Sequence, residues 1–391
     1  MSRTQVGIVG AGPAGLTLGH LLHREGIDSV ILENRSREYV HARVRAGVLE
    51  HDVAELFDRA DVGERMRREG LVHRGIELQS GRSRHRIAFD ELVGKSIVVY
   101  GQTEVVKDLI EARLESGRPL HFDVADVSLH DLDGERPRIR YVDEEAAHVL
   151  ECDVVAGCDG FHGVSRPSIP AGVLREHVRE YPYGWLGILA TVAPSHDELI
   201  YAQTERGFAL LSMRSPELSR LYLQCATDEN LDEWPDERIW EELQARLGVD
   251  GWTLNEGPIL EKGVTPMRSF VVEPMQWGRL FLAGDAAHIV PPTGAKGLNL
   301  AIRDVSVLAE ALVEWYRSGD SGLLDAYSET CLRRVWRAEH FSWWMTTTLH
   351  RAPSDDEFAL RRRRGTAVPT ASARRRSSAS ASPPSRGSAP R

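Results

Sequence analysis

Gly10-Ala11-Gly12-Pro13-Ala14-Gly15 is a G-x-G-x-x-G run that joins an apolar segment to a helical one. Residues 5–9 predict a buried strand, residues 14–25 a helix, and residues 29–32 a second strand that ends at Glu33. A strand, a glycine turn, a helix and a second strand make a βαβ unit, whose strands lie parallel in one sheet. The sequence therefore predicts an α/β fold that begins with a Rossmann-like domain.

Each glycine of this run has its own role in binding a dinucleotide. Gly10 permits the tight turn after the strand, and Gly12 lets a pyrophosphate approach the backbone at the helix N-terminus. Gly15 lets the helix pack closely on the strand. Glu33 can accept hydrogen bonds from ribose hydroxyls. Because the strand, the helix and the acid are all in place, the run indicates a dinucleotide site rather than an ordinary turn.

The composition narrows the classes of protein. The chain has 391 residues, 42% of them apolar, which is enough for two domains. Four cysteines without a C-x-x-C pair favour reduced thiols in a cytoplasmic protein. No run reaches the roughly 18 apolar residues of a membrane span. The net charge of −10 argues against a nucleic-acid partner, and no spacing of His, Cys, Asp and Glu predicts a metal site.

The organisation of the chain follows from its alternating segments. A long helical region is predicted from 295 to 350, with a break near 319–322. The predicted parts are the dinucleotide-binding domain with some strands of the second domain (1–180), a sheet-containing substrate domain (181–268), a return to the first domain with interface helices (269–357), and a disordered basic tail (358–391).

The tail has an abrupt change of composition. After Phe358 the nine basic residues are all arginines, and no acidic residue occurs. Without apolar periodicity the segment cannot offset the entropy lost on ordering, so we expect disorder. It is either a basic arm that binds acidic surfaces or an altered C-terminus, as from a shifted reading frame, and the abruptness favours the second explanation.

Two later stretches identify the dinucleotide. One runs from Asp153 through Asp159-Gly160 to Arg166, and the other from Arg279 through Gly284-Asp285 to His288. Together with the first run they resemble the three fingerprints of the FAD-dependent aromatic hydroxylases, the group A flavoprotein monooxygenases. This resemblance implies that FAD is the cofactor and that Asp285 holds its ribitol chain.

The resemblance extends from residue 4 to about residue 358. Residues 43–50 and 100–104 resemble flavin-contacting segments of the family, and the helix opened by residues 293–299 would aim N–H groups at the flavin pyrimidine edge. The cofactor-binding residues thus expected are Gly10, Gly12, Gly15, Glu33, Arg43, Val44, Arg45, Ala46, Gly47, Val48, Gln102, Asp159, Asp285, Leu298 and Asn299.

A substrate pocket follows from the same resemblance. An aromatic acid needs a cation for its carboxylate, and Arg214 can bind it bidentately, with Ser212 and Tyr222 beside it. At the other pole Tyr201 can hydrogen-bond a developing phenolate, and the Pro292 carbonyl can contact the same oxygen. Taken one at a time, Tyr201 would usually be a core residue and Arg214 a surface ion-pair partner.

Further residues complete the expected site. By the resemblance, His73 connects a proton path to solvent, and Arg220 and Arg45 place positive charge near the flavin. Met213 lies between two of the substrate residues. The catalytic residues thus expected are Tyr201, Pro292, His73 and Arg220, and the substrate-binding residues are Tyr201, Ser212, Met213, Arg214, Tyr222 and Pro292.

The activity that the resemblance implies is hydroxylation of 4-hydroxybenzoate to 3,4-dihydroxybenzoate by O₂ through a flavin C4a-hydroperoxide. The resemblance also implies a homodimer. Asn34 stands where the family commonly has an arginine that meets a nucleotide 2′-phosphate, so the electron donor is NADPH or NADH. The family's second tyrosine has no counterpart, because no Tyr follows Tyr327. Two alternatives stay open: a hydroxylase of another aromatic acid, or a flavin-binding protein with impaired turnover.

Overall fold

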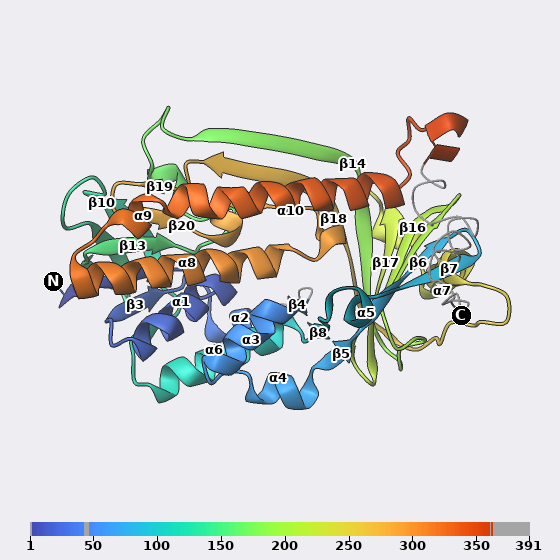
Figure 1. Ribbon diagram of the computed structural model, residues 1–391, viewed down its shortest axis with the longest axis horizontal. Helices are drawn as coiled ribbons and strands as arrows, with labels where there is room; N and C mark the ends of the chain where they lie inside the picture. The colour runs from blue at the N-terminus through green and yellow to red at the C-terminus, as the bar shows by residue number, and fades with distance from the viewer. Residues whose placement is uncertain (1, 43–46, 360, 363–391) are drawn as a thin grey trace, which may run out of the picture.

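The computed structural model describes residues 2–42, 47–359 and 361–362. Its first layer is a six-stranded sheet in the order β19-β20-β13-β2-β3-β9, in which β19 alone runs antiparallel to its neighbour (Figure 1). The strands are β2 (Val6–Val9), β3 (Ser29–Leu32), β9 (Leu120–His121), β13 (Val154–Gly157), β19 (Gln276–Trp277) and β20 (Leu280–Leu282). The predicted βαβ unit is confirmed, with α1 at Pro13–Arg24.

Helices and a second sheet bury the two faces of this layer. On one face α1 packs against α6 (Gln102–Glu115) and α8 (Gly297–Ser318). On the other face Ile139 lies so close to Gly7 that a Cβ on this glycine would be 2.6 Å from the Ile139 side chain. Ile139 belongs to a four-stranded sheet made of β1 (Ser2–Arg3), β10 (Ala125–His130), β11 (Arg138–Asp143) and β12 (Ala146–Glu151).

The second large layer is an eight-stranded sheet in the order β21-β18-β14-β17-β16-β15-β6-β7. Its strands are β6 (Gly75–Ser80), β7 (Ser83–Ala88), β14 (Arg175–Thr191), β15 (Ile200–Thr204), β16 (Gly207–Ser215), β17 (Leu218–Cys225), β18 (Ile259–Glu273) and β21 (His288–Ile289). Helix α7 (Asp236–Leu247) packs on β15 and β16. The predicted sheet-containing substrate domain is therefore present, and β6 and β7 join it from the first part of the chain.

A small sheet and short helices lie between the two layers (Figure 1). Its order is β4-β8-β5. These elements are β4 (Val48–Glu50), β5 (Leu71–His73), β8 (Ile97–Val99), α2 (Arg37–Ala42), α3 (His51–Arg59), α4 (Glu64–Glu69) and α5 (Phe89–Val93).

The C-terminal helices join the two layers. After α8 the chain forms α9 (Gly322–Asp325) and α10 (Tyr327–Leu349). This confirms the predicted helical region and its break, since Gly319 adopts a φ of +78° that ends α8. Helix α10 runs alongside β18 and reaches the eight-stranded sheet at its C-terminal end (Figure 1).

The domain division stays a prediction, because β14 runs across its boundary at residue 180 and β18 across that at residue 268. The four cysteines, Cys152, Cys158, Cys225 and Cys331, are buried and not disulfide-bonded. Within the described residues, no helix has the length and apolar character that crossing a bilayer requires. The tail from residue 363 lies outside the described residues, as does residue 360.

Candidate cofactor and substrate site

The three glycine-containing motifs meet at the carboxyl ends of neighbouring strands. Strand β13 pairs with β2 on one side and with β20 on the other, so the turns that follow these strands share one edge of the sheet. A Cβ on Gly10, which has a φ of +104°, would be 2.9 Å from the Asp159 Cα. Gly284, with a φ of +61°, faces the side chains of Ala301 and Ala14. Such an edge is where α/β sheets bind nucleotides.

Gly12 and Gly15 differ in what surrounds them. A Cβ on Gly15 would be 2.0 Å from the Gly10 carbonyl oxygen, so the helix packs on the turn as predicted. A Cβ on Gly12 would have no neighbour within 4 Å. The helix N-terminus therefore presents open space at Gly12, and the N–H groups of a first helical turn point to such a space, which fits a pyrophosphate. Glu33 follows β3, and its carboxylate accepts hydrogen bonds from Ala11 N at 2.7 Å and Arg35 N at 3.0 Å.

The turn that carries Asp285 is held by two residues to which the sequence analysis gave no role. One carboxylate oxygen of Asp304 accepts from Gly284 N at 3.1 Å and lies 2.6 Å from His288 Nε2, so it bonds both ends of the turn. Burial alone lowers the pKa of His288, but the Asp304 carboxylate outweighs it and raises that pKa. The sequence feature that could have pointed to Asp304 is an acidic residue among the apolar residues of the buried face of α8.

Asp159 is bonded within its own turn. Its carboxylate accepts from Ser165 N at 2.8 Å and Ser165 Oγ at 2.9 Å. Burial raises the pKa of this carboxyl group, and its second oxygen is buried without a partner among the described residues. The bonded oxygen therefore stabilises the loop, and the carboxylate is engaged within the protein rather than open to a ligand.

The other expected cofactor residues lie around the start of α8. A Cβ on Gly47 would be 2.7 Å from Gln102 N, so these two segments touch. Asn299 donates to the Val48 carbonyl at 2.9 Å and accepts from Glu50 N at 2.8 Å, which ties α8 to β4. Its side chain is thus engaged by the protein, and its backbone and that of Leu298 remain at the helix N-terminus. Arg43, Val44, Arg45 and Ala46 lie outside the described residues.

The expected substrate residues share one face of the eight-stranded sheet. Tyr201 on β15 is opposite Leu210 on β16, which is opposite Tyr222 on β17. Ser212 is opposite Arg220 in the next row of the same face. Directly opposed residues point to the same side of a sheet. Along β17 the burial alternates, with this face half-buried and the other fully buried. Residues distant in sequence are thus gathered on one face.

Within the described part of the chain, Arg214 is a cation without an anionic partner. Its Nη1 donates to the Met213 carbonyl at 2.8 Å and its Nη2 lies 3.4 Å from the Tyr222 hydroxyl, while Nε is buried without a hydrogen bond. No carboxylate among the described residues forms an ion pair with it. Burial lowers the pKa of this guanidinium. A cation removed in part from water is costly unless an anion pairs with it, so this side chain is suited to bind an anionic ligand.

Other residues of the expected pocket contact groups of the protein itself. The Ser212 hydroxyl donates to the Arg220 carbonyl at 2.8 Å, so it is not directed at Arg214. Arg220 lies 3.7 Å from Glu261 and over the ring of Tyr222. The Pro292 carbonyl accepts from Ala295 N at 2.9 Å, which closes its turn. Met213 is buried at 1% exposure.

Tyr201 and His73 are buried titratable groups. Burial raises the pKa of the Tyr201 phenol, so the group keeps its proton at neutral pH. Burial lowers the pKa of His73, against the opposing effect of Glu198, and its Nδ1 is buried without a partner. His73 ends β5, close to the segment that leads into β15. The role that the resemblance implies for His73, connecting a proton path to solvent, stays a prediction.

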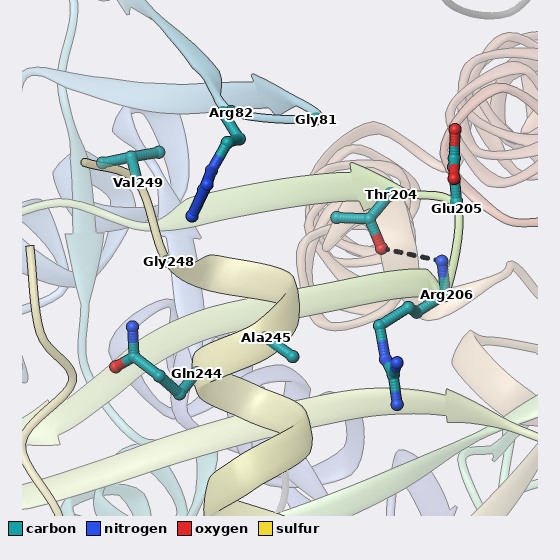
Figure 2. A pocket seen from close by; sticks show the side chains of 9 residues that line it. All are labelled: Gly81, Arg82, Thr204, Glu205, Arg206, Gln244, Ala245, Gly248 and Val249. Atoms are coloured by element: carbon teal, nitrogen blue, oxygen red, sulfur yellow. Dashed lines mark hydrogen bonds between the residues drawn. The ribbon is translucent and has the colours of Figure 1, made fainter.

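Two other features lie away from this site. A cavity of about 420 Å³ opens at the outer end of the sheet between the β6–β7 turn, the β15–β16 turn and the end of α7 (Figure 2). It contains none of the predicted site residues. A group of three possible ligands, His51, Asp52 and Glu55, lies on α3, but Asp52 already contacts Lys95 at 2.6 Å and Arg303 at 2.9 Å. That no metal is bound stays a prediction.

Comparisons with known proteins agree with this geometry. A sequence family described as FAD binding domain matches residues 3–342. The p-hydroxybenzoate hydroxylase of Acinetobacter baylyi is 50% identical over 351 residues, which are 89% of this chain and 87% of that protein. A probable NADH-specific resorcinol 4-hydroxylase of Rhodococcus jostii is 26% identical over 82% of this chain and 61% of its own length. The fold matches the crystal structure of p-nitrophenol 4-monooxygenase from Pseudomonas putida with a TM-score of 0.79, 20% identity and 93% coverage of both chains.

Proposed function

Because the chain belongs to the family of FAD-dependent aromatic hydroxylases, we propose that it converts 4-hydroxybenzoate to 3,4-dihydroxybenzoate. The protein is an FAD-dependent monooxygenase. Its substrates are then the small aromatic acid, O₂ and a reduced nicotinamide, either NADPH or NADH.

The observation that carries the choice of substrate is the placement of Arg214. It is a half-buried guanidinium whose Nε is fully buried, with no carboxylate partner among the described residues. Its Nη2 lies 3.4 Å from the hydroxyl of Tyr222, which shares one row of the sheet with Tyr201. A ligand with a carboxylate at one end and a phenol at the other satisfies both groups, since the anion pairs with Arg214 and Tyr201 hydrogen-bonds the phenolic oxygen. This is the arrangement of charges in 4-hydroxybenzoate.

The chain's residues also fit the cofactor. Gly12 leaves room for a pyrophosphate, Glu33 stands at the ribose position, and the turn of Asp285 is held rigid by Asp304. When bound, FAD accepts hydride from the nicotinamide and activates O₂. The protein holds the phenol ring in place, makes the ring more electron-rich by hydrogen-bonding its oxygen through Tyr201, and excludes water. His73 is proposed to carry the phenolic proton away.

The direct test is turnover of 4-hydroxybenzoate by the full-length, FAD-loaded protein. We expect formation of 3,4-dihydroxybenzoate coupled to oxidation of NADH or NADPH. Tyr201→Phe keeps the ring but removes the hydroxyl, and we expect it to lower hydroxylation about 10- to 100-fold, the effect of one hydrogen bond to a charged group. The measurement is the ratio of product formed to nicotinamide oxidised, by chromatography and absorbance. FAD content serves as the control.

Two outcomes would favour the alternatives. If 4-hydroxybenzoate stimulates neither nicotinamide oxidation nor product formation, while another aromatic acid does both, the substrate assignment is wrong. If the protein binds FAD but hydroxylates nothing, and Tyr201→Phe makes no further difference, it is a flavin-binding protein with impaired turnover. The absence of a tyrosine after Tyr327 is the feature that favours this second alternative.

We also propose that the protein is a cytoplasmic homodimer. Its four free cysteines support a reducing compartment. The outer face of α10 supports a dimer, because several of its aromatic side chains are exposed although such residues are usually covered. They are Trp336, Phe341, Trp343 and Trp344.

The dimer has its own test. Sedimentation equilibrium should give twice the mass of the chain, and Trp344→Glu should shift the protein toward the monomer, because it places a charge in an apolar contact. Leu323→Glu is the control, as this exposed residue lies on α9, away from the aromatic face. A monomeric unmodified protein would contradict the proposal.

A further inference from the structure

The C-terminal end of α10 is joined to the eight-stranded sheet by a buried histidine. His350 has 1% of its surface exposed. Its Nε2 accepts from the Trp185 indole N–H at 2.7 Å, and its Nδ1 lies 2.9 Å from the Thr346 carbonyl. Because a carbonyl oxygen only accepts, Nδ1 carries the proton and Nε2 is the acceptor. Both ring nitrogens are therefore hydrogen-bonded, Nδ1 to helix α10 and Nε2 to strand β14 of the sheet.

The His350 ring also stacks between aromatic side chains of the sheet. Its centroid lies 4.4 Å from that of Phe208 and 5.9 Å from that of Trp185. Phe208 in turn lies 6.2 Å from Tyr201, and Trp185 lies 4.7 Å from Tyr222. The Tyr222 hydroxyl contacts Arg214. A single side chain, Phe208, therefore lies between His350 and Tyr201, which is at the phenol end of the expected pocket. Two side chains, Trp185 and Tyr222, lie between His350 and Arg214, which is at the carboxylate end.

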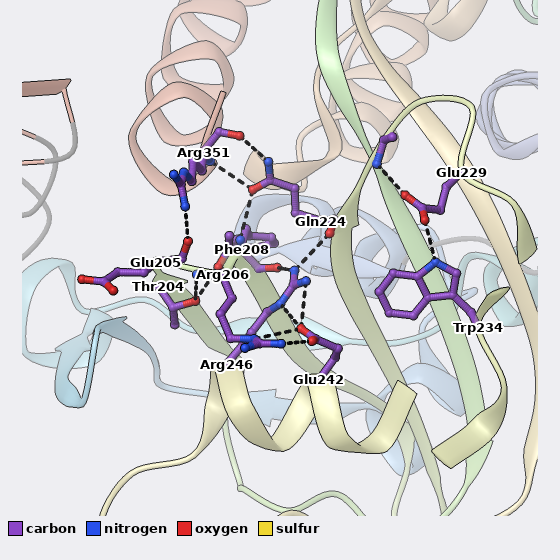
Figure 3. Close-up of polar contacts among 12 residues, drawn as sticks. Thr204, Glu205, Arg206, Phe208, Gln224, Glu229, Trp234, Glu242, Arg246 and Arg351 are labelled. Carbon is purple, nitrogen blue, oxygen red and sulfur yellow. Dashed lines mark hydrogen bonds and ion pairs between the residues drawn. The ribbon is translucent and has the colours of Figure 1, made fainter. Parts of the chain in front are cut away.

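Polar contacts of the next residue strengthen this junction (Figure 3). The Gln224 amide oxygen accepts from Arg351 N at 3.0 Å and from Phe208 N at 3.1 Å. The Arg351 guanidinium donates to the Glu205 carbonyl at 2.6 Å. Arg246, which lies on α7, donates to the backbone carbonyls of Phe208 and Gln224. We call His350 and Arg351 the α10 latch.

The same helix end also contacts the loop that leads into α8. Thr346, one turn before His350, donates from its hydroxyl to that of Thr293 at 2.9 Å. Thr293 follows Pro292 at the edge of the proposed pocket. Through the α10 latch and Thr346, the end of α10 therefore contacts residues next to three parts of the expected site that come from distant segments: Tyr201, Arg214 and the Pro292 loop.

We propose that His350 is a positioning residue that sets the distance between the two poles of the aromatic-acid pocket through its hydrogen bond to Trp185 and its stacking on Phe208. This inference rests on the proposed function, because it needs the pocket between Tyr201 and Arg214. His350 touches neither substrate nor cofactor in it. It acts by fixing β14 and β16 to the rigid helix α10.

The test measures binding of 4-hydroxybenzoate to the full-length, FAD-loaded protein through the change in flavin absorbance. His350→Phe keeps an aromatic ring but leaves the Trp185 N–H without an acceptor. The stranded N–H favours a shift of Trp185 toward another acceptor, and this shift moves Tyr222 and Arg214, which Trp185 contacts directly or through Tyr222. We therefore expect about a tenfold rise in Kd with unchanged FAD content. In the double variant Trp185→Phe/His350→Phe no donor is stranded, and we expect Kd to return to within about threefold of the original.

Tyr327→Phe is the matched control. It removes one buried hydrogen bond of the same helix, from the Tyr327 hydroxyl to the Leu282 carbonyl at 2.8 Å, at the end away from the sheet. We expect it to lower the melting temperature without changing Kd. A His350→Phe protein that binds within twofold of the original, or a Tyr327→Phe protein that loses affinity equally, overturns the inference. An unmodified protein that does not bind 4-hydroxybenzoate overturns the proposed function, and the positioning role with it.

Discussion

Arg214→Ala should raise the Kd for 4-hydroxybenzoate about 100-fold or more, while FAD remains bound. A bidentate pair between a guanidinium and a carboxylate contributes about 3 kcal/mol or more in a buried site, and each 1.4 kcal/mol is a factor of ten in Kd. Arg214 meets the conditions for such a pair, since its Nε is buried and no carboxylate of the described residues neutralises it. Binding is measured by titrating the flavin absorbance with the acid.

Binding of a second ligand, phenol, tests whether the loss of affinity is specific to the carboxylate. Phenol keeps the hydroxyl group but lacks the carboxylate, so its weak binding should be the same in the original protein and in Arg214→Ala. Arg214→Met is the stability control, because an apolar side chain of similar volume removes an unpaired buried cation, and the melting temperature without substrate should not fall. Equal losses for phenol and 4-hydroxybenzoate would contradict a role in binding the carboxylate.

Gly12→Val should abolish FAD binding and leave the fold intact. A side chain at this position meets no atom of the protein within 4 Å, and Gly12 has a φ of −76° that valine can adopt. The added methyl groups instead occupy the space at the α1 N-terminus where the pyrophosphate must approach. The purified protein should be colourless, with an unchanged circular dichroism spectrum.

Gly263→Val provides a matched comparison for this variant. Gly263 also has open space around an added Cβ, but it lies in β18, opposite Gly187 in the eight-stranded sheet, and not at the sheet edge that carries the three glycine motifs. We expect that variant to keep its FAD. Gly15→Val should fail to fold, since its Cβ would lie 2.0 Å from the Gly10 carbonyl oxygen. Retention of FAD by Gly12→Val would show that the cofactor does not lie across this helix end.

The parts of the site that the sequence predicted are built from neighbouring residues. The run from Gly10 to Gly15 joins β2 to α1 as expected, because turn, cap and packing distance there depend on a few adjacent residues. Leu210 and Ser212 share a face because side chains alternate along one strand, and their partners Tyr222 and Arg220 lie on that face too. The resemblance to the family indicated which of these residues belong to one cofactor site and one substrate pocket. The expected flavin-contacting residues 43–46 lie outside the described residues.

The amino-acid sequence by itself thus determined the βαβ unit, the helices and the types of residue that the chemistry needs, since these follow from local periodicity and backbone preference. Only the tertiary structure decided that Tyr201 lies in one row with Tyr222, that Asp304 bonds the turn of Asp285, and that His350 meets Trp185, 165 residues away. Strand register and helix docking are set by the packing of whole layers, and no short stretch of sequence contains that information.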